Sequence, residues 1–466
     1  MATSEVREER VHELNEAEVR ESGDYVLYWM QQSQRAVHND ALEYAAGRAN
    51  ELSLPLLAVF GLTDDYPEAN ARHYAFMLEG LKDAGETLRD RGIQFVVGRG
   101  SPDEVALRYG ERASLIVTDG AYLRPEKAWK QLVAEEAGCL VIGVESNVVV
   151  PVELASNKRE HAARTLRPKI HKHLDHFLVA LEPTKVEHDS LGLDVEDGVD
   201  LSDIDAVLDG MDLDEGAWPL RGMYTGGATA GREALACFLK ENFAEYVEHR
   251  NQPQTSDVSH MSKYLHYGHL SPVYVVLEVM NSGGPEDDID SYVEEVVVRR
   301  ELSMNFCFYT PDYDSYSCLP DWAKKTLEEH KGDEREYVYT RKQLENAETH
   351  DPYWNAAMRE MVHTGYMHNH MRMYWGKKIL EWSNTPEYAY ETTLYLNDKY
   401  FVDGRDANSY ANIAWVFGNH DRGWKERDVL GKIRYMSAGG LERKAKPKEY
   451  VEKVERLVEE GRPEAL

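Results

Sequence analysis

Two segments in the second half of the chain carry side chains whose types and spacing could do chemistry. In the first, residues 257–272 (DVSHMSKYLHYGHLSP), Ser259 and Ser262 flank an expected helix start. Hydroxyls and free backbone N–H groups at a helix N-terminus can bind a phosphate. The alternative is that these serines only cap the helix. This segment alone leaves both interpretations open.

The second segment, residues 349–382, is rich in tryptophan and predicts two helices broken near Thr364–Gly365. Trp375 and Trp382 are seven residues apart, so they share a helix face about 10 Å apart along the axis. Trp354 belongs to the preceding helix. Core packing is the commoner reason for such a cluster, and an electron relay is the alternative because indole rings can pass electrons over such steps.

Residues 396–437 are polar, and we expect them to be loop-rich. Dense polar side chains with few apolar neighbours suggest the wall of a site. Arg372, on the helix before, is a plausible ion-pair partner for Asp403, although a surface pair would contribute little. The side chains concerned are Asn397, Asp403, Arg405, Asp406 and Asn408, with Trp415 and Trp424 among them.

The first half of the chain predicts the scaffold. Short apolar runs alternate with helical stretches at 67–91 and 124–137, a pattern typical of an α/β domain with a parallel sheet, whose ligands bind at the carboxyl ends of the strands. The expected strands are 25–30, 55–62, 93–98, 114–120 and 139–146.

Three further regions complete the expected organisation. Residues 1–21 are a polar lead-in, and 181–216 is an acidic stretch that we expect to be solvated and mobile. From residue 229 onward the periodicity is helical. We therefore predict an α/β domain at 22–170, a linker at 171–225 and an all-α domain at 226–466.

The composition of the chain argues against several classes of function. The net charge of −30 over 466 residues argues against nucleic-acid binding unless a local basic face survives. The four cysteines form no CxxC pair, so we expect no metal site. The N-terminus is not a secretory signal, and no apolar run is long enough to span a membrane. We expect a cytoplasmic protein.

Several longer motifs, taken together and in order, resemble class II cyclobutane pyrimidine dimer DNA photolyases. YLHYGHLSP (264–272) is similar to the flavin-phosphate segment of the wider photolyase/cryptochrome family. The class II motifs are EHAARTLRPKI (160–170), RRELSMNFCFY (299–309), THDPYWNAAMREMV (349–362), MRMYWGKKILEW (371–382), LNDKYFVDGRDANSYANIAW (396–415) and GKIRYMS (431–437).

The resemblance implies an FAD-binding helical domain behind an α/β antenna domain. It implies repair of a dimer flipped out of double-stranded DNA, by one electron from photoexcited reduced FAD. Asn397 matches the residue facing flavin N5. The implied FAD contacts are Tyr246, Ser259, His260, Met261, Ser262, Arg372, Asp403, Asp406 and Asn408. The implied electron carriers are Trp375, Trp354 and Trp382. The implied dimer contacts are Glu295, Met373, Trp415, Arg250 and Arg299.

Basic side chains of the same half could form the local DNA-binding face; they are Arg299, Arg300, Lys377, Lys378, Arg422, Arg427, Lys432 and Arg434. Some positions depart from the family pattern. Lys263 stands where relatives usually have proline, and Arg299 where some have tryptophan. The segment 418–431, over the lesion, lacks the usual prolines.

Alternatives remain. A cryptochrome-like photoreceptor would keep FAD without repair, but such proteins often have long C-terminal tails, whereas about 30 residues follow GKIRYMS here. A (6-4) photolyase would need a histidine pair at the lesion. A nucleotide-binding α/β protein explains only the first half. We further expect a monomer, an antenna that is 8-hydroxy-5-deazaflavin rather than folate, and, from the acidity, a halophilic archaeal source.

Overall fold

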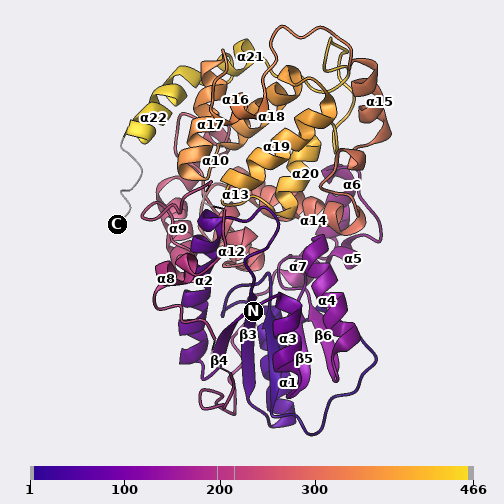
Figure 1. The fold of residues 1–466 in the computed structure, drawn as a ribbon, viewed down its shortest axis with the longest axis vertical. Helices are drawn as coiled ribbons and strands as arrows, with labels where there is room; N and C mark the ends of the chain where they lie inside the picture. Colours follow the sequence, from indigo (N-terminus) through magenta and orange to yellow (C-terminus); the bar gives the residue numbers. More distant parts are fainter. Residues whose placement is uncertain (1–4, 197, 215, 460–466) are drawn as a thin grey trace.

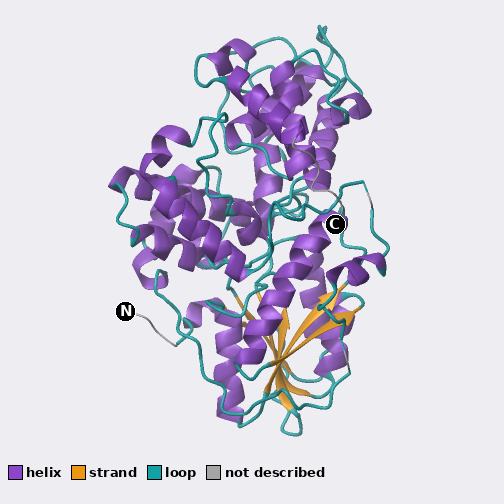
Figure 2. Cartoon of the chain, turned by 90° about the vertical axis from the view of Figure 1, so that its left-hand side faces the viewer, coloured by secondary structure: helices purple, strands orange, loops and turns teal. Residues whose placement is uncertain are grey.

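The computed structural model describes residues 5–196, 198–214 and 216–459. Its first part is built on a six-stranded sheet of order β1-β6-β5-β2-β3-β4. The sheet is drawn in orange in Figure 2. The five predicted strands are confirmed to within two residues. The strands are β1 (Val11–Glu13), β2 (Tyr25–Met30), β3 (Leu56–Leu62), β4 (Gln94–Arg99), β5 (Ala113–Asp119) and β6 (Leu140–Val144).

The polar lead-in predicted at 1–21 contains a short strand that was not predicted. Val11–Glu13 pairs antiparallel with β6 and closes one edge of the sheet. Arg10, just before it, is 2% exposed and donates to the carbonyl oxygens of Glu145 at 2.8 Å and Val149 at 2.8 Å. Hydrogen bonds from the backbone and from Arg10 hold this three-residue edge strand in place. It therefore needs no apolar run, and the sequence gives no sign of it.

Helices cover both faces of the sheet, which explains why its central strands are apolar throughout. Alternate residues of β2 pack on opposite faces, Tyr28 beneath α1 and α2, and Trp29 beneath α3 and α4. The predicted helical stretches correspond to α2 and α4. The bounds are α1 Asp40–Leu52, α2 Ala71–Asp90, α3 Pro102–Gly110 and α4 Arg124–Glu136.

Most described residues of the acidic stretch are exposed, as expected, but the stretch also packs along the sheet. Its described residues follow edge strand β4, where Val199 N–H donates to Val97 O at 2.7 Å and Ser190 N–H to Gly92 O at 2.9 Å. Val186, Val199 and Leu201 pack against the core of the sheet. A few apolar residues among many acidic ones are enough to pack this stretch against the sheet. The domain division at this stretch stays a prediction.

The second half is helical, as predicted, and stands above the sheet in Figure 1. Beyond Val144 the described residues form no further strand, only isolated bridges. The longer helices are α6 (Ala163–His171), α9 (Ala228–Glu241), α12 (Pro272–Met280), α13 (Glu286–Val293), α14 (Arg300–Tyr309), α15 (Asp321–Glu329), α17 (Pro352–Thr364), α18 (Asn369–Trp382), α19 (Pro386–Tyr400), α20 (Ala407–Val416) and α22 (Pro447–Glu459).

Short helices connect these. They are α5 (Val152–Ala155), α7 (Leu174–Phe177), α8 (Ile204–Asp209), α10 (Tyr246–His249), α11 (Ser262–His266), α16 (Arg341–Glu345) and α21 (Ala438–Glu442), the π-helical turn η3 (Glu294–Arg299), and the 3-10 turns η1 (Glu8–Arg10), η2 (Phe243–Glu245) and η4 (Tyr316–Cys318). Among the described helices, none combines the length and apolar character needed to cross a bilayer.

The break predicted near Thr364–Gly365 is confirmed. Helix α17 ends at Thr364, and Gly365 follows in the left-handed region with φ of 62°, where glycine carries no Cβ penalty. The expectation that 396–437 is loop-rich was partly wrong, since 396–400 ends α19 and 407–416 forms α20. Their polar side chains face a cavity inside the protein, which blurs the apolar periodicity of both helices.

Candidate active site

A large cavity opens among the helices in the upper half of Figure 1. It encloses about 1490 Å³, its open mouth included. We call it the central cavity. The elements that line it are α10, residues 258–262, α11, α13, η3, the start of α14, the connection between α17 and α18, helices α18, α19 and α20, and residues 401–406.

All the residues predicted to contact the cofactor line this cavity, although they come from four separate stretches of sequence. They are Tyr246, Ser259, His260, Met261, Ser262, Arg372, Asp403, Asp406 and Asn408. The predicted residues Asn397, Glu295, Trp375, Met373 and Arg250 line it as well. The polar segments therefore form one wall, as the sequence suggested.

Ser259 and Ser262 do not cap helix α11 with their side chains, so the capping interpretation of residues 257–272 is not supported, and phosphate binding there stays a prediction. Helix α11 has no capping side chain. The Ser259 hydroxyl accepts from the Tyr292 hydroxyl at 2.9 Å and from Met261 N–H at 3.4 Å. His260 stands in the left-handed region with φ of 54°, and this turn directs the segment along the cavity.

Arg372 and Asp403 form an ion pair inside the protein rather than on its surface. Arg372 Nη2 lies 2.8 Å from Asp403 Oδ1, and the side chains are only 22% and 11% exposed. Burial raises the pKa of Asp403, but the Arg372 charge and the Ser262 hydroxyl outweigh it and hold that pKa below its usual value. The guanidinium lies over the Phe401 ring, 3.7 Å from its centroid. A fixed, ionised pair is thus built into the wall.

Asn397 lies on α19, 4% exposed, with its amide fixed by its neighbour. Nδ2 donates to Asp398 Oδ1 at 2.8 Å, and the same carboxylate accepts from Arg405 N–H at 3.0 Å. Burial raises the pKa of Asp398 to about 6. Asp398 therefore fixes one end of an amide that lines the cavity.

Glu295 stands at the mouth of the cavity on the π-helical turn η3, an irregularity common at functional sites. Its carboxylate pairs with Arg250 Nη2 at 2.5 Å, and its side chain is 37% exposed. Arg250 also donates to Ser291 Oγ at 2.5 Å. Glu295 therefore combines a fixed position with access to a large ligand.

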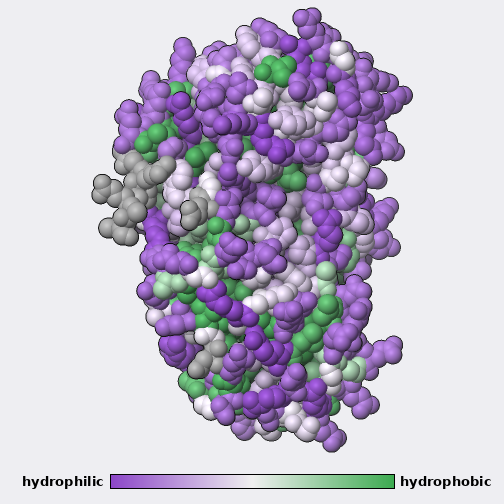
Figure 3. All heavy atoms as spheres, in the orientation of Figure 1, coloured by the Kyte–Doolittle hydropathy of each residue, from purple (hydrophilic) through white to green (hydrophobic). Residues whose placement is uncertain are grey.

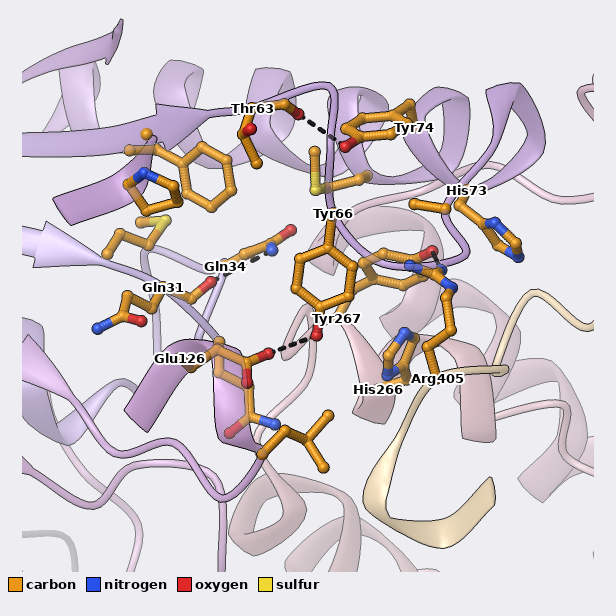
Figure 4. Close-up of a pocket in the computed structure, with 18 of the residues that line it drawn as sticks. Gln31, Gln34, Thr63, Tyr66, His73, Tyr74, Glu126, His266, Tyr267 and Arg405 are labelled. Carbon is orange, nitrogen blue, oxygen red and sulfur yellow. Dashed lines mark hydrogen bonds between the residues drawn. The ribbon is translucent and has the colours of Figure 1, made fainter. Parts of the chain in front are cut away.

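A second cavity, the interdomain cavity of about 820 Å³, lies where the sheet meets the helical half (Figure 4). It opens at the carboxyl ends of β2 and β3, as expected of ligand sites in such sheets. Tyr66 points to Glu126, with its hydroxyl donating at 2.7 Å, while Arg405 reaches in from the helical half. Asp406 lines both cavities, so the two are neighbours.

Comparisons with known proteins agree with this architecture. The family model described as DNA photolyase matches residues 26–187. The deoxyribodipyrimidine photo-lyase of Methanothermobacter thermautotrophicus is 49% identical over 458 residues, which cover 98% of this chain and 100% of the relative. The chain belongs to the DNA photolyase family.

Solved structures share the fold of this photolyase-family chain. A Sulfolobus tokodaii photolyase solved with two FAD molecules gives a TM-score of 0.69 at 17% identity, covering 92% of this chain and 89% of that one. A Synechocystis cryptochrome gives a TM-score of 0.69 at 16% identity, covering 92% and 87%. At these identities the likeness establishes the fold alone.

The three tryptophans of this photolyase-family chain are core residues, and the electron relay stays a prediction. Trp354, Trp375 and Trp382 are 0%, 2% and 3% exposed and belong to the largest core cluster. They are also in contact: Trp354 Nε1 donates to Trp375 O at 3.0 Å, and the rings of Trp354 and Trp382 lie 5.9 Å apart. Only Trp375 reaches the central cavity.

Two predicted dimer contacts lie outside the lining of the central cavity. Trp415 is half-buried on α20. Arg299 turns back to Glu294, with Nε 3.0 Å from Oε1, and its side chain is 42% exposed. Both follow or precede lining residues in the chain, but neither side chain is part of the cavity lining.

The predicted basic face is smaller than expected. Arg300, Lys377 and Lys378 are 5%, 1% and 6% exposed; the first two donate to the carbonyl oxygens of Asn147 and Val416, and Lys378 pairs with Glu381. Because α14 and α18 are central helices, much of their circumference faces inward. Cations that stay exposed or half-exposed are Arg299, Arg422, Arg427, Lys432 and Arg434.

Several lining residues were missed by sequence reasoning, notably Tyr292, Arg300, Tyr366 and His368. Arg300 was predicted only as a surface cation. A polar residue within a helical run gives no sign of whether it faces a cavity or solvent. The signal that could have found Tyr366 and His368 is their place at the predicted helix break, where helix ends leave backbone groups free to bind a ligand.

Lys263, which stands where relatives usually have proline, is 2% exposed. Its ammonium lies 3.8 Å from the centroid of the Tyr224 ring and donates to His260 O at 3.0 Å. Burial lowers the pKa of Lys263 to about 7. In this chain a hydrogen bond from the Lys263 side chain therefore holds the turn at His260.

Proposed function

We propose that this chain is a deoxyribodipyrimidine photo-lyase that repairs cyclobutane pyrimidine dimers in DNA under light. One observation carries the proposal: the residues predicted to hold FAD and the residues predicted to contact the dimer, Glu295, Met373 and Arg250, line the same cavity. Cofactor and lesion could therefore meet without an intervening wall. The high identity to a photo-lyase over nearly the whole chain supports it.

The central cavity fits FAD. Several of its lining side chains carry buried polar atoms without a hydrogen-bond partner in the described structure; they are His260 Nδ1, Arg300 Nε and Nη2, His368 Nε2 and Trp375 Nε1. Such atoms are costly unless a ligand satisfies them. Residues 259–262 would hold the phosphate and ribityl parts. FAD would supply light absorption and the electron for the dimer.

The chain's own residues would supply position and charge. The Arg372–Asp403 pair would hold the polar edge of the flavin ring, and the Asn397 amide, fixed by Asp398, would face N5. Glu295, held by Arg250, would hydrogen-bond a thymine of the dimer. Trp375, Trp354 and Trp382 would carry electrons inward when oxidised flavin is reduced by light.

The interdomain cavity is the site that we propose for an antenna. The side-chain oxygens of Gln31, Gln32 and Gln34 have no hydrogen-bond partner within the described structure and border this cavity. Flat walls come from Phe60, Tyr66 and Tyr267. A planar heterocycle with a polar edge suits them, and 8-hydroxy-5-deazaflavin is preferred over folate. Its proximity to the central cavity, across Asp406, would favour energy transfer.

The finer assignments are part of the same proposal. The class II motifs quoted above support class II membership, and the acidic composition supports a halophilic archaeal source. We propose double-stranded DNA as the partner, a monomeric enzyme, and a cytoplasmic location with nucleoid association during repair. Exposed Trp424 between Arg422 and Arg434, at 5.4 and 5.1 Å, supports a DNA-facing role for the 418–431 loop.

The test is repair of irradiated DNA by purified, flavin-loaded protein. Blue light should remove cyclobutane dimers, and darkness should not. Glu295→Gln should lower repair at least ten-fold, about 1.4 kcal/mol, while FAD content stays unchanged. The matched control is Glu294→Gln, on the same turn but paired with Arg167 and Arg299. Flavin binding with no repair under any light would favour the cryptochrome-like receptor instead.

A further inference from the structure

The proposed tryptophan relay does not end at solvent. Trp382, its outermost member, is only 3% exposed. An oxidised indole there carries a positive charge in a desolvated site. The Lys378 ammonium, itself paired with Glu381 at 2.6 Å, lies 5.5 Å from the Trp382 ring. A buried radical cation out of reach of reductants in solution would simply recombine, so the relay needs a further donor.

Aromatic rings continue the path from Trp382 to the surface. The His350 ring lies 5.0 Å from the Trp382 ring and the Tyr339 ring 5.6 Å from it. Tyr337 stacks on His350 at 3.6 Å with an interplanar angle of 14°, and Tyr337 is 37% exposed. These spacings resemble the 5.9 Å between Trp354 and Trp382.

Hydrogen bonds prepare Tyr339 for oxidation. Its hydroxyl oxygen accepts from the backbone N–H of His350 at 3.0 Å and lies 2.8 Å from His350 Nδ1. With an N–H already donating to the oxygen, the phenolic proton points to the imidazole. Tyr339 N–H donates to Trp382 O at 3.0 Å, which holds the two residues together. A phenol gives up an electron readily only when a base takes its proton.

We propose that Tyr339 is the terminal electron donor of the relay and that His350 accepts its proton; this rests on the relay proposed above. One electron passes from Tyr339 to the Trp382 radical cation, which returns to neutral tryptophan. The phenolic proton moves to His350 Nδ1, leaving a neutral tyrosyl radical beside an imidazolium. A thiol in solution then gives the tyrosyl radical a hydrogen atom and becomes a thiyl radical, and His350 releases its proton to water.

The decisive variant is Tyr339→Phe, which keeps the ring and removes the O–H. Transient absorption and electron paramagnetic resonance after a light flash should show a tyrosyl radical in the wild type. In Tyr339→Phe that signal should vanish and a tryptophan radical should replace it. Net photoreduction with thiol should fall at least three-fold. Tyr388→Phe is the matched control, since Tyr388 bonds Arg341 N–H at 2.8 Å and should leave both signals unchanged.

A second variant tests the proton acceptor. His350→Phe keeps a ring beside Trp382 but removes the base, so tyrosyl formation should slow and lose its dependence on deuterated solvent. A wild type that shows only a tryptophan radical, with decay identical in Tyr339→Phe, overturns this inference and leaves the relay standing. If Trp375→Phe also leaves radical formation unchanged, the relay itself is wrong, and the inference falls with it.

Discussion

At the scale of single residues, the site depends on buried charges and their fixed partners. Arg372→Met leaves the buried carboxylate of Asp403 without its ion-pair partner, which costs about 3 kcal/mol. We expect purified protein to lose most of its flavin, measured as the ratio of flavin to protein absorbance. Arg372→Lys keeps the charge without the planar fork, so its loss should be smaller. Equal flavin content in both variants would contradict this role.

Trp375 is the residue where the relay meets the central cavity. Trp375→Phe should abolish light-driven reduction of oxidised flavin, because phenylalanine is much harder to oxidise than tryptophan. Repair by enzyme reduced chemically beforehand should stay within about two-fold of wild type, a change below 0.5 kcal/mol. Measuring both rates on one preparation separates the two roles. An equal loss of flavin photoreduction and of repair would show that Trp375 serves mainly to shape the cavity.

At the scale of secondary-structure elements, the N-terminus of α17 sets how Trp354 meets α18. Asp351 accepts from the backbone N–H groups of Tyr353 and Trp354, at 2.9 and 3.1 Å, and from the Tyr374 hydroxyl on α18. Asp351→Ala should lower the free energy of unfolding by about 1–2 kcal/mol, seen as a lower urea midpoint. Thr340→Ala, which removes the cap of peripheral helix α16, should cost less than Asp351→Ala. If Asp351→Ala lowers the free energy of unfolding no more than Thr340→Ala does, Asp351 does not set how α17 meets α18.

At the scale of the whole molecule, Glu301 of α14 joins the helical half to the α/β half. It is 3% exposed and accepts from Val149 N–H at 2.5 Å and Val150 N–H at 3.3 Å. Burial raises the pKa of Glu301 from 4.5 to about 8, although these N–H groups and Arg300 act in the opposite direction. Between about pH 4.5 and about pH 8 the native state holds a proton on Glu301 that the unfolded state lacks, so the free energy of unfolding falls as the pH rises.

Glu301→Gln removes this titration. Relative to the variant, the wild type should therefore lose stability as the pH rises from about 4.5 through about 8. Urea midpoints of both proteins across that range provide the measurement. A difference that does not change with pH would show that Glu301 is ionised in the folded protein throughout.

Net charge acts on the molecule as a whole. The chain carries −30, and Figure 3 shows a predominantly hydrophilic face with a few apolar patches. Self-repulsion of this size opposes compactness and is screened by salt. We expect the melting temperature to rise by several degrees between dilute buffer and molar potassium chloride. A melting temperature that does not change with salt would show that self-repulsion of the net charge does not limit stability.

By itself, the sequence determined the fold class, the five parallel strands and the segments that line the cavity. These follow from local patterns: apolar runs for strands covered on both faces, helical periodicity in the second half, and polar stretches such as 257–272 and 396–408 that break it. The family motifs then assigned roles to Asn397, Glu295 and Arg372, and the cavity contains all three.

Only the tertiary structure decided which side chains meet. Spacing could not show that Arg300 and Lys377 face inward, because helical periodicity gives relative directions and not the direction of the core. Nor could it place Tyr339 and His350 against Trp382, or dock the acidic stretch on β4. These contacts join residues far apart in the chain, and packing of whole elements, rather than local preference, brings them together.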